Sequence, residues 1–147
     1  QGYLNSPQKT AEVIKQLGGL RWYVSGDKGR LDADGFLTLI DRYSRFAKLV
    51  GEMISLTAVE DNIRLAMDAS EIDFVAINLP DLKKGEKIVV LCTTAMQPDN
   101  LRHSMLANGC NPLMIPNEYY QIAEIPKLGA GKTDFKQAKT LALELSA

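Results

Sequence analysis

A lysine among glycines and an acidic, glycine-rich stretch are the parts of this chain best suited to chemistry. The lysine is Lys132, in PKLGAGK at 126–132, and the acidic stretch is WYVSGDKGRLDADGFLTLIDR at 22–42. A lysine on a loop softened by glycines can carry a compact positive charge into a narrow cleft. There it would stabilise negative charge growing on a phosphate or a reacting carboxylate. A carboxylate such as Asp27 can accept hydrogen bonds from sugar hydroxyls. The two segments predict chemistry on a nucleotide, performed together with a further body of protein.

The segment GAGKT at 129–133 matches only the end of a phosphate-binding loop. The full pattern G-x-x-x-x-G-K-[ST] requires a glycine where this chain has Pro126, because backbone N–H groups wrap the phosphates. Proline has no N–H to donate and a fixed φ. No apolar strand ending in aspartate accompanies it, so the segment does not predict a nucleotide hydrolase. On these residues alone, a solvated lysine in a loop before a helix is the simpler interpretation of Lys132.

Composition limits the remaining classes of function. The chain has 147 residues, 46% of them hydrophobic, and its 17 Lys and Arg nearly balance its 18 Asp and Glu. No global field therefore favours nucleic acid, and we expect no nucleic-acid partner. Cys92, Cys110 and the single His103 do not form a zinc pattern, so we expect packed, reduced thiols and no metal site. No apolar run reaches the length of a membrane span. The start QGYLN predicts a fragment of a longer polypeptide.

Hydrophobic spacing and turn residues predict the elements that must position these groups. Expected helices cover 6–17, 57–67, 98–109 and 134–145, and expected strands cover 73–79, 87–93 and 118–125, with two brief strands around Gly51. Asp34 and Gly35 predict a hairpin turn, since glycine adopts positive φ without strain. The fold class is α+β: a small three-stranded sheet with packed helices. A helix and a β-hairpin segment precede it.

Three motifs in this order resemble the adenylate-forming enzymes, the superfamily of acyl-CoA synthetases, luciferases and nonribosomal peptide adenylation domains. They are WYxSGD with GxxDxDGF and Asp41-Arg42 over 22–42, KxxG with Ile54 and Glu60 over 48–60, and IPKxxxGK over 125–132. The resemblance covers nearly the whole chain. Within the superfamily it is closest to the synthetase part of bifunctional 2-acylglycerophosphoethanolamine acyltransferase/acyl-[acyl-carrier-protein] synthetases. It implies that residues 1–41 end an N-terminal core and form a junction hairpin, and that 42–147 form a mobile C-terminal domain.

The resemblance also implies roles for five residues. Asp27 resembles the aspartate that binds the ribose hydroxyls of ATP, and Arg42 resembles an arginine beside the hinge that reaches the nucleotide. Lys132 resembles the lysine that stabilises the adenylation transition state. Lys48 matches a basic position facing the adenylate or the thiol tunnel after domain rotation, and Gly51 matches a glycine lining that tunnel. Without the resemblance, these residues are a turn aspartate, a surface ion pair, a loop lysine, a strand lysine and a hairpin glycine.

The implied reaction is ATP-dependent ligation of a fatty acid to a thiol, in a phospholipid-acylating bifunctional enzyme. The implied cofactors are ATP or AMP and Mg²⁺, the metal being bound mainly by an N-terminal adenylation core of the same polypeptide. The acceptor is the phosphopantetheine thiol of acyl carrier protein, or alternatively free coenzyme A. We expect the fragment to be inactive alone, and the full-length protein to lie on the cytoplasmic side, associated with the inner membrane.

A non-catalytic module that docks an acidic carrier protein is the alternative from another class of function. Arg45, Lys48 and Arg64 are its candidate contacts, because acidic partners seek basic surfaces. Three positions depart from the superfamily pattern: Asp41, Ser44 and Met53. Met53 leaves a polar contact to the nucleotide in doubt at that position, whereas Asp27 and Lys132 are unaffected.

Overall fold

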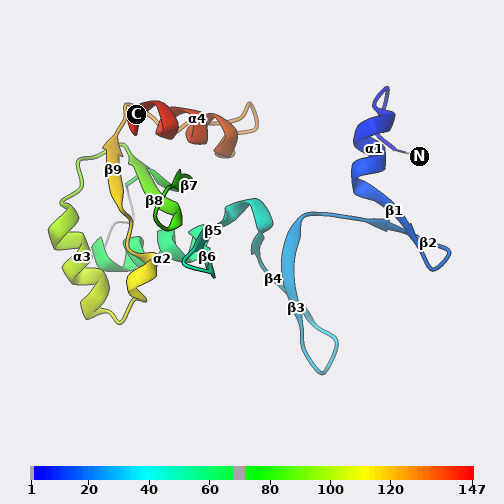
Figure 1. The fold of residues 1–147 in the computed structure, drawn as a ribbon, viewed down its shortest axis with the longest axis horizontal. Coiled ribbons are helices and arrows are strands. Elements are labelled where there is room, and N and C mark those ends of the chain that lie inside the picture. The colour runs from blue at the N-terminus through cyan, green and yellow to red at the C-terminus, as the bar shows by residue number, and fades with distance from the viewer. Residues whose placement is uncertain (1, 68–71) are drawn as a thin grey trace. The chain divides into compact units, whose positions relative to one another are not determined.

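The computed structural model describes residues 2–67 and 72–147 of the chain. The chain divides into two compact units, Gln1–Ser44 and Arg45–Ala147. Figure 1 shows the helices and strands of each unit. Within the described residues, no helix combines the length and apolar character needed to cross a membrane.

The first unit begins with a short helix and a β-hairpin. Its bounds are α1 at Pro7–Val13, β1 at Ile14–Leu17 and β2 at Leu20–Tyr23. The helix predicted over 6–17 is therefore wrong in its second half. Gly18 and Gly19 both adopt positive φ, 58° and 76°, and form a two-residue turn that pairs β1 antiparallel with β2. The glycine pair was expected to end a helix, but it forms the turn of a hairpin. The residues before it pair with the β-favouring Trp22 and Tyr23 of β2.

A second hairpin follows, and it confirms the turn predicted at Asp34 and Gly35. Its strands are β3 at Asp27–Leu31 and β4 at Leu37–Arg42. One carboxylate oxygen of Asp32 accepts the backbone N–H groups of Asp34 and Phe36, at 3.0 and 2.8 Å. Gly35 has a φ of 87°, as the turn requires. This hairpin is therefore specified by local turn chemistry.

The first unit has no apolar core of its own. None of the described residues 2–44 is buried. Most of its large apolar side chains are exposed, including Leu17, Leu20, Trp22, Tyr23, Val24, Leu31, Phe36, Leu37, Leu39, Ile40 and Tyr43. Exposed apolar side chains in this number are more typical of a surface that packs against another than of a free one.

The second unit is built on a five-stranded sheet. Its strands are β5 at Phe46–Leu49, β6 at Glu52–Ser55, β7 at Phe74–Asp81, β8 at Gly85–Cys92 and β9 at Glu118–Gln121. The order is β6-β5-β8-β7 with antiparallel pairs, and β9 lies parallel to β8. The predicted α+β class is confirmed. The sheet exceeds the three strands expected because the two brief strands around Gly51 join it, where Leu49 pairs with Gly85.

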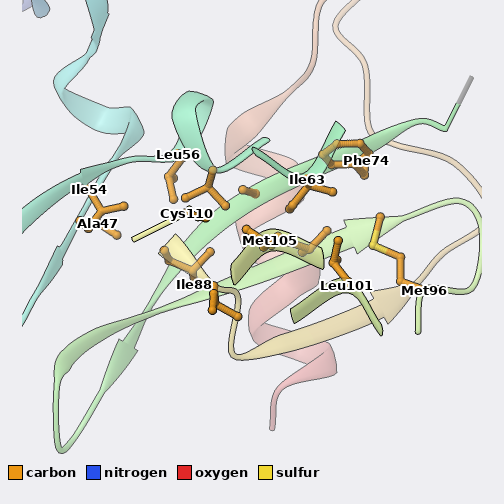
Figure 2. Packing of buried hydrophobic residues seen from close by; sticks show 14 of the residues in the cluster. Ala47, Ile54, Leu56, Ile63, Phe74, Ile88, Met96, Leu101, Met105 and Cys110 are labelled. Atoms are coloured by element: carbon orange, nitrogen blue, oxygen red, sulfur yellow. The ribbon is translucent and has the colours of Figure 1, made fainter. Parts of the chain in front are cut away.

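Helices cover both faces of this sheet. They are α2 at Leu56–Met67, α3 at Pro98–Ala107 and α4 at Phe135–Leu145, with 3₁₀ turns at Tyr43–Arg45 and Pro112–Met114. Alternate residues of β7 and β8 point to opposite faces, as the pleat of a strand dictates. Ala76 and Ile88 belong to the cluster packed against α2 and α3, which Figure 2 shows from close by. Val75 and Val89 belong to the cluster packed against α4.

Candidate functional site

Asp27 and Arg42, both predicted to contact a nucleotide, lie side by side in the first unit. They are direct partners across β3 and β4, and cross-strand partners of opposite charge attract each other. The Nε atom of Arg42 lies 3.2 Å from Oδ1 of Asp27, and the Asp27 side chain is 29% exposed while that of Arg42 is 71% exposed. The backbone N–H of Asp27 also binds Oγ of Ser25 at 3.2 Å. The pair is therefore oriented and open to solvent, which suits a carboxylate that accepts hydrogen bonds from hydroxyl groups.

Lys132 lies on a hairpin-like loop that backbone hydrogen bonds close. The N–H of Leu128 donates to the carbonyl of Lys132 at 2.7 Å, and the N–H of Gly131 donates to the carbonyl of Leu128 at 2.8 Å. Lys127 and Thr133 form an antiparallel bridge. Gly131 has a φ of 78°, so the three-residue tip has the form of a turn followed by a left-handed glycine.

The base of this loop is held from both sides. The N–H of Asp134 donates to the carbonyl of Pro126 at 2.8 Å, and Asp134 caps α4 by accepting two backbone N–H groups. Ile125 is buried in the cluster under α4. The ammonium of Lys127 lies 3.3 Å from Asp73, just before β7. In this conformation the loop backbone is closed by hydrogen bonds, and the exposed Lys132 side chain extends from it.

Lys48 and Gly51 lie on the β5–β6 hairpin of the second unit. Lys48 is exposed opposite Met53, and its backbone N–H donates to Oε2 of Glu86. Gly51 has a φ of 88°, and a Cβ built there would meet no atom within 4 Å. Glycine is required at this position by the turn, and the space around it is open.

Val50 is a residue that sequence reasoning missed. Its φ is 51°, which is rare for a β-branched side chain, and 70% of the side chain is exposed. With Gly51 it forms a turn in which both central residues have positive φ, the form preferred in two-residue hairpins. Backbone strain of this kind concentrates at functional segments. The β-branched residue directly before a hairpin glycine was the signal available in the sequence.

The loop that carries Lys132 and the turn that carries Gly51 are attached to opposite ends of the β7–β8 hairpin. The first is tied to Asp73, before the start of β7, and the second pairs with Gly85, after its end. Strand β7 has eight residues, Phe74–Asp81. Asp73 and Asp81, the partner of Gly85, are eight residue steps apart, so at about 3.4 Å per residue these attachment points are separated by roughly 27 Å. The second unit therefore presents the two groups at separate places.

Arg45 and Glu60 form a buried ion pair that was not predicted. The NH2 atom of Arg45 lies 2.8 Å from Oε1 of Glu60, with side-chain exposures of 6% and 11%. Arg45 is thus wrong as a surface contact for a carrier protein. Arg64 keeps its charge at the surface, pairs with Asp61 at 3.2 Å and lies over the ring of Phe74. A glutamate among the apolar positions of α2 was the one sequence signal for a buried partner.

The cysteines and the histidine have the packing and surface positions predicted for them. Cys92 and Cys110 are free and buried, and burial raises the pKa of both thiols. His103 is exposed on α3. Among the described residues, no group of three or more His, Cys, Asp and Glu side chains is placed to hold a metal ion.

Comparison with known proteins gives many relatives, although no protein-family profile matches the chain. The chain is 29% identical over 170 residues to AM-toxin synthetase AMT1 of Alternaria alternata, covering 99% of the chain and 4% of that protein. It is 28% identical over 145 residues to a medium/long-chain-fatty-acid–CoA/3-oxocholest-4-en-26-oate–CoA ligase of Mycobacterium marinum, covering 94% of the chain and 25% of the ligase. The chain thus spans a quarter or less of these relatives.

Solved structures match as well. The amide bond synthetase McbA of Marinactinospora thermotolerans is 26% identical with a TM-score of 0.57, over 95% of the chain and 28% of McbA. ATP-bound MatB of Rhodopseudomonas palustris is 16% identical with a TM-score of 0.79, over 100% of the chain and 29% of MatB, which shows the fold. The homologues of this chain are therefore AMP-forming acyl-CoA synthetases and related adenylate-forming enzymes, and its fold matches their C-terminal domain.

Proposed function

We propose that this chain is the C-terminal part of an ATP-dependent acid–thiol ligase, and that its second unit serves two successive half-reactions with two different surfaces. The observation that carries the proposal is the attachment of the Lys132 loop and the Gly51 turn to opposite ends of the β7–β8 hairpin. Segments attached at points roughly 27 Å apart present their groups at separate places, which favours action on one reacting centre at different moments. Successive use, with the unit presenting first one end and then the other, accounts for both.

In the first half-reaction, a carboxylate oxygen of the acid attacks the α-phosphorus of ATP. A new O–P bond forms, the bond to the bridging oxygen breaks, and pyrophosphate leaves with its electron pair. Lys132 carries a positive charge that stabilises the negative charge developing on the reacting oxygens. Asp27 accepts hydrogen bonds from the ribose hydroxyls, and Arg42, paired with it at 3.2 Å, orients that carboxylate and reaches the nucleotide.

In the second half-reaction, a thiol attacks the acyl carbon of the adenylate, loses its proton and displaces AMP to give a thioester. The β5–β6 hairpin serves this step, with Lys48 exposed beside the open space at Gly51. The donor set fits ATP, because a partly exposed carboxylate and a guanidinium lie together in the first unit. Mg²⁺ would neutralise phosphate charge and would be bound mainly by the adenylation core.

The first unit explains why a further body of protein is needed. Its exposed apolar residues require a partner surface, and the chain spans only about a quarter of the fatty-acid ligases it resembles. We infer that the partner is the N-terminal adenylation core of the same polypeptide, which would also hold the fatty acid. On this view the isolated chain is inactive.

For the thiol acceptor, the phosphopantetheine arm of acyl carrier protein is our inference from the sequence resemblance, in a phospholipid-acylating enzyme on the cytoplasmic side of the inner membrane. Free coenzyme A is the second candidate, and it is favoured by similarity to ligases whose names specify coenzyme A. The rates of thioester formation with purified carrier protein and with coenzyme A, measured side by side, distinguish the two acceptors.

The test of the proposal is Lys132→Ala in the full-length polypeptide. Acyl-adenylate formation, followed by ATP–pyrophosphate exchange, should fall by roughly 10²- to 10³-fold, since one transition-state contact is lost. Thioester formation from preformed acyl-adenylate should keep its rate. Lys136→Ala, another exposed lysine four residues further on, is the matched control and should change neither step. Equal losses in both half-reactions would contradict the assigned role.

A further inference from the structure

The buried Arg45–Glu60 pair lies where the second unit begins. Arg45 is the first residue of that unit and is 5% exposed, and Glu60 on α2 is 9% exposed. Taking two charges out of water is expensive, and an apolar pair of similar volume would often serve stability as well. We therefore looked for a role of this pair in positioning other groups, and the hydrogen bonds of the two side chains indicate one.

Both members of the pair bind the backbone of one residue in β7. The N–H of Ala76 donates to Oε1 of Glu60 at 2.8 Å, and the NH1 group of Arg45 donates to the carbonyl of Ala76 at 2.8 Å. A second nitrogen of Arg45 reaches Oγ1 of Thr57 at 3.5 Å. The planar fork of arginine allows these contacts at once, which the point charge of a lysine cannot reproduce. The guanidinium is therefore fixed in position and orientation.

The fixed guanidinium in turn supports the first residue of α4. Cζ of Arg45 lies 4.3 Å from the centroid of the Phe135 ring, within the range of a cation–π contact. Phe135 directly follows Asp134, whose backbone N–H closes the Lys132 loop through the carbonyl of Pro126. The ring is 43% exposed, so this contact, more than burial, sets its place. A continuous set of contacts thus runs from the start of the second unit to the loop of Lys132.

We propose that Arg45 is a positioning residue for Lys132 and acts through the ring of Phe135. The inference rests on the proposed role of Lys132 in adenylation. Arg45 touches no reacting atom; it fixes Phe135, which fixes the base of the loop and thereby the direction from which the ammonium reaches the nucleotide. Misplacement of a catalytic group by about 1 Å can change a rate by two orders of magnitude, so such support has a measurable effect.

Phe135→Leu in the full-length polypeptide is the test. It keeps an apolar side chain at an exposed position and removes the ring face. Acyl-adenylate formation should fall about tenfold, and transfer from preformed acyl-adenylate should be unchanged. Phe135→Tyr keeps the ring and should restore the rate. Leu143→Ala, an apolar truncation on α4 at a residue with 47% exposure, is the matched control and should leave both steps unchanged.

The same substitution in the Lys132→Ala background separates positioning from general damage. If Phe135 acts through Lys132, Phe135→Leu should have no further effect once Lys132 is gone. An independent tenfold loss there, or equal losses in both half-reactions, would overturn the inference while leaving the role of Lys132 intact. No effect of Lys132→Ala itself would instead refute the proposed function. Arg45→Lys gives a second measurement, in which adenylation should again fall while transfer persists.

Discussion

The second unit buries residues on both faces of its sheet, whereas none of the described residues 2–44 of the first unit is buried. Their ion pairs differ in the same way: Arg45 and Glu60 are buried and bind a strand backbone, and Asp27 and Arg42 lie at the surface. The second unit is therefore stabilised by its own core. The first unit is ordered by turns and strand pairing, and most of its large apolar side chains are exposed. Under the proposed function, the lysine that acts in adenylation lies on the unit with a core, and the junction that docks on the adenylation core lies on the unit without one.

The contrast between the two units predicts its largest effect on the free energy of unfolding when a buried side chain of the second unit is truncated. Ile63 on α2 is fully buried in the cluster of Figure 2, and Ile63→Ala should lower the free energy of unfolding by about 2–5 kcal/mol. Urea unfolding of this chain followed by far-UV circular dichroism measures the change. Leu39→Ala in the first unit, at a side chain with 67% exposure, should change it by less than about 0.5 kcal/mol.

The single tryptophan sharpens the same comparison, because Trp22 lies in the first unit on β2. Its fluorescence reports on that unit, and Ile63→Ala should leave the fluorescence transition where it was. If fluorescence and circular dichroism shift together by the same amount, the two units unfold as one body, and the contrast between them is wrong.

A smaller, pH-dependent effect is expected where α4 ends against the sheet. Partial burial opposes ionisation of Glu118, but hydrogen bonds from Lys87 at 2.6 Å, Tyr120 at 2.8 Å and Ser146 at 3.2 Å outweigh it and lower the pKa of that carboxyl. A carboxyl whose pKa is lower in the folded state adds stability above its unfolded pKa, about 4.3, and loses it as the pH falls through the folded value. Glu118→Gln should therefore reduce stability at pH 7 and change it little near pH 2.

Chemical denaturation across this range, with the wild-type chain in parallel, measures the difference. If the difference in unfolding free energy between Glu118→Gln and the wild type stays constant from pH 7 to pH 2, the charge of the Glu118 carboxylate does not contribute to stability through Lys87. Glu144→Gln on the exposed face of α4 is the matched control, and it should not reproduce the pH dependence.

Most of the fold was predictable because its signals are local. The turn at Asp34 and Gly35, the helices α2, α3 and α4, and the strands β7 and β8 all follow from spacing and turn residues. The glycine pair at 18 and 19 misled, since the same residues end a helix or turn a hairpin, and only pairing with β2 decides. The sheet was underestimated because short strands join it through a single pair, Leu49 with Gly85.

In the candidate site, too, contacts between residues close in sequence were predictable and contacts between distant residues were not. Asp27 and Arg42 are close in sequence across one hairpin, so their pairing follows from register. The contact of Arg45 with Phe135 spans ninety positions and has no sequence pattern, because it depends on where α4 packs on the sheet. The hydrogen bonds that close the Lys132 loop were not predicted either, because glycines in a sequence indicate conformational freedom and do not show which of them adopts positive φ in a turn, as Gly131 does.

The smallest expected effect concerns the exposed ion pair of the first unit. Exposed pairs contribute about 0.2–1 kcal/mol and are screened by salt, so Asp27→Asn and Arg42→Gln should show a coupling energy within that range. The backbone N–H of Tyr43 donates to the carbonyl of Gly26 at 2.9 Å, and these two residues adjoin Arg42 and Asp27 in the sequence. The rate of hydrogen exchange at the Tyr43 amide therefore measures local stability beside the pair. Breaking the pair should speed its exchange about fivefold or less, and high salt should remove the difference. A coupling of several kcal/mol that persists in high salt would instead mean that this pair behaves like Arg45 and Glu60, and that the first unit carries a stabilising polar centre of its own.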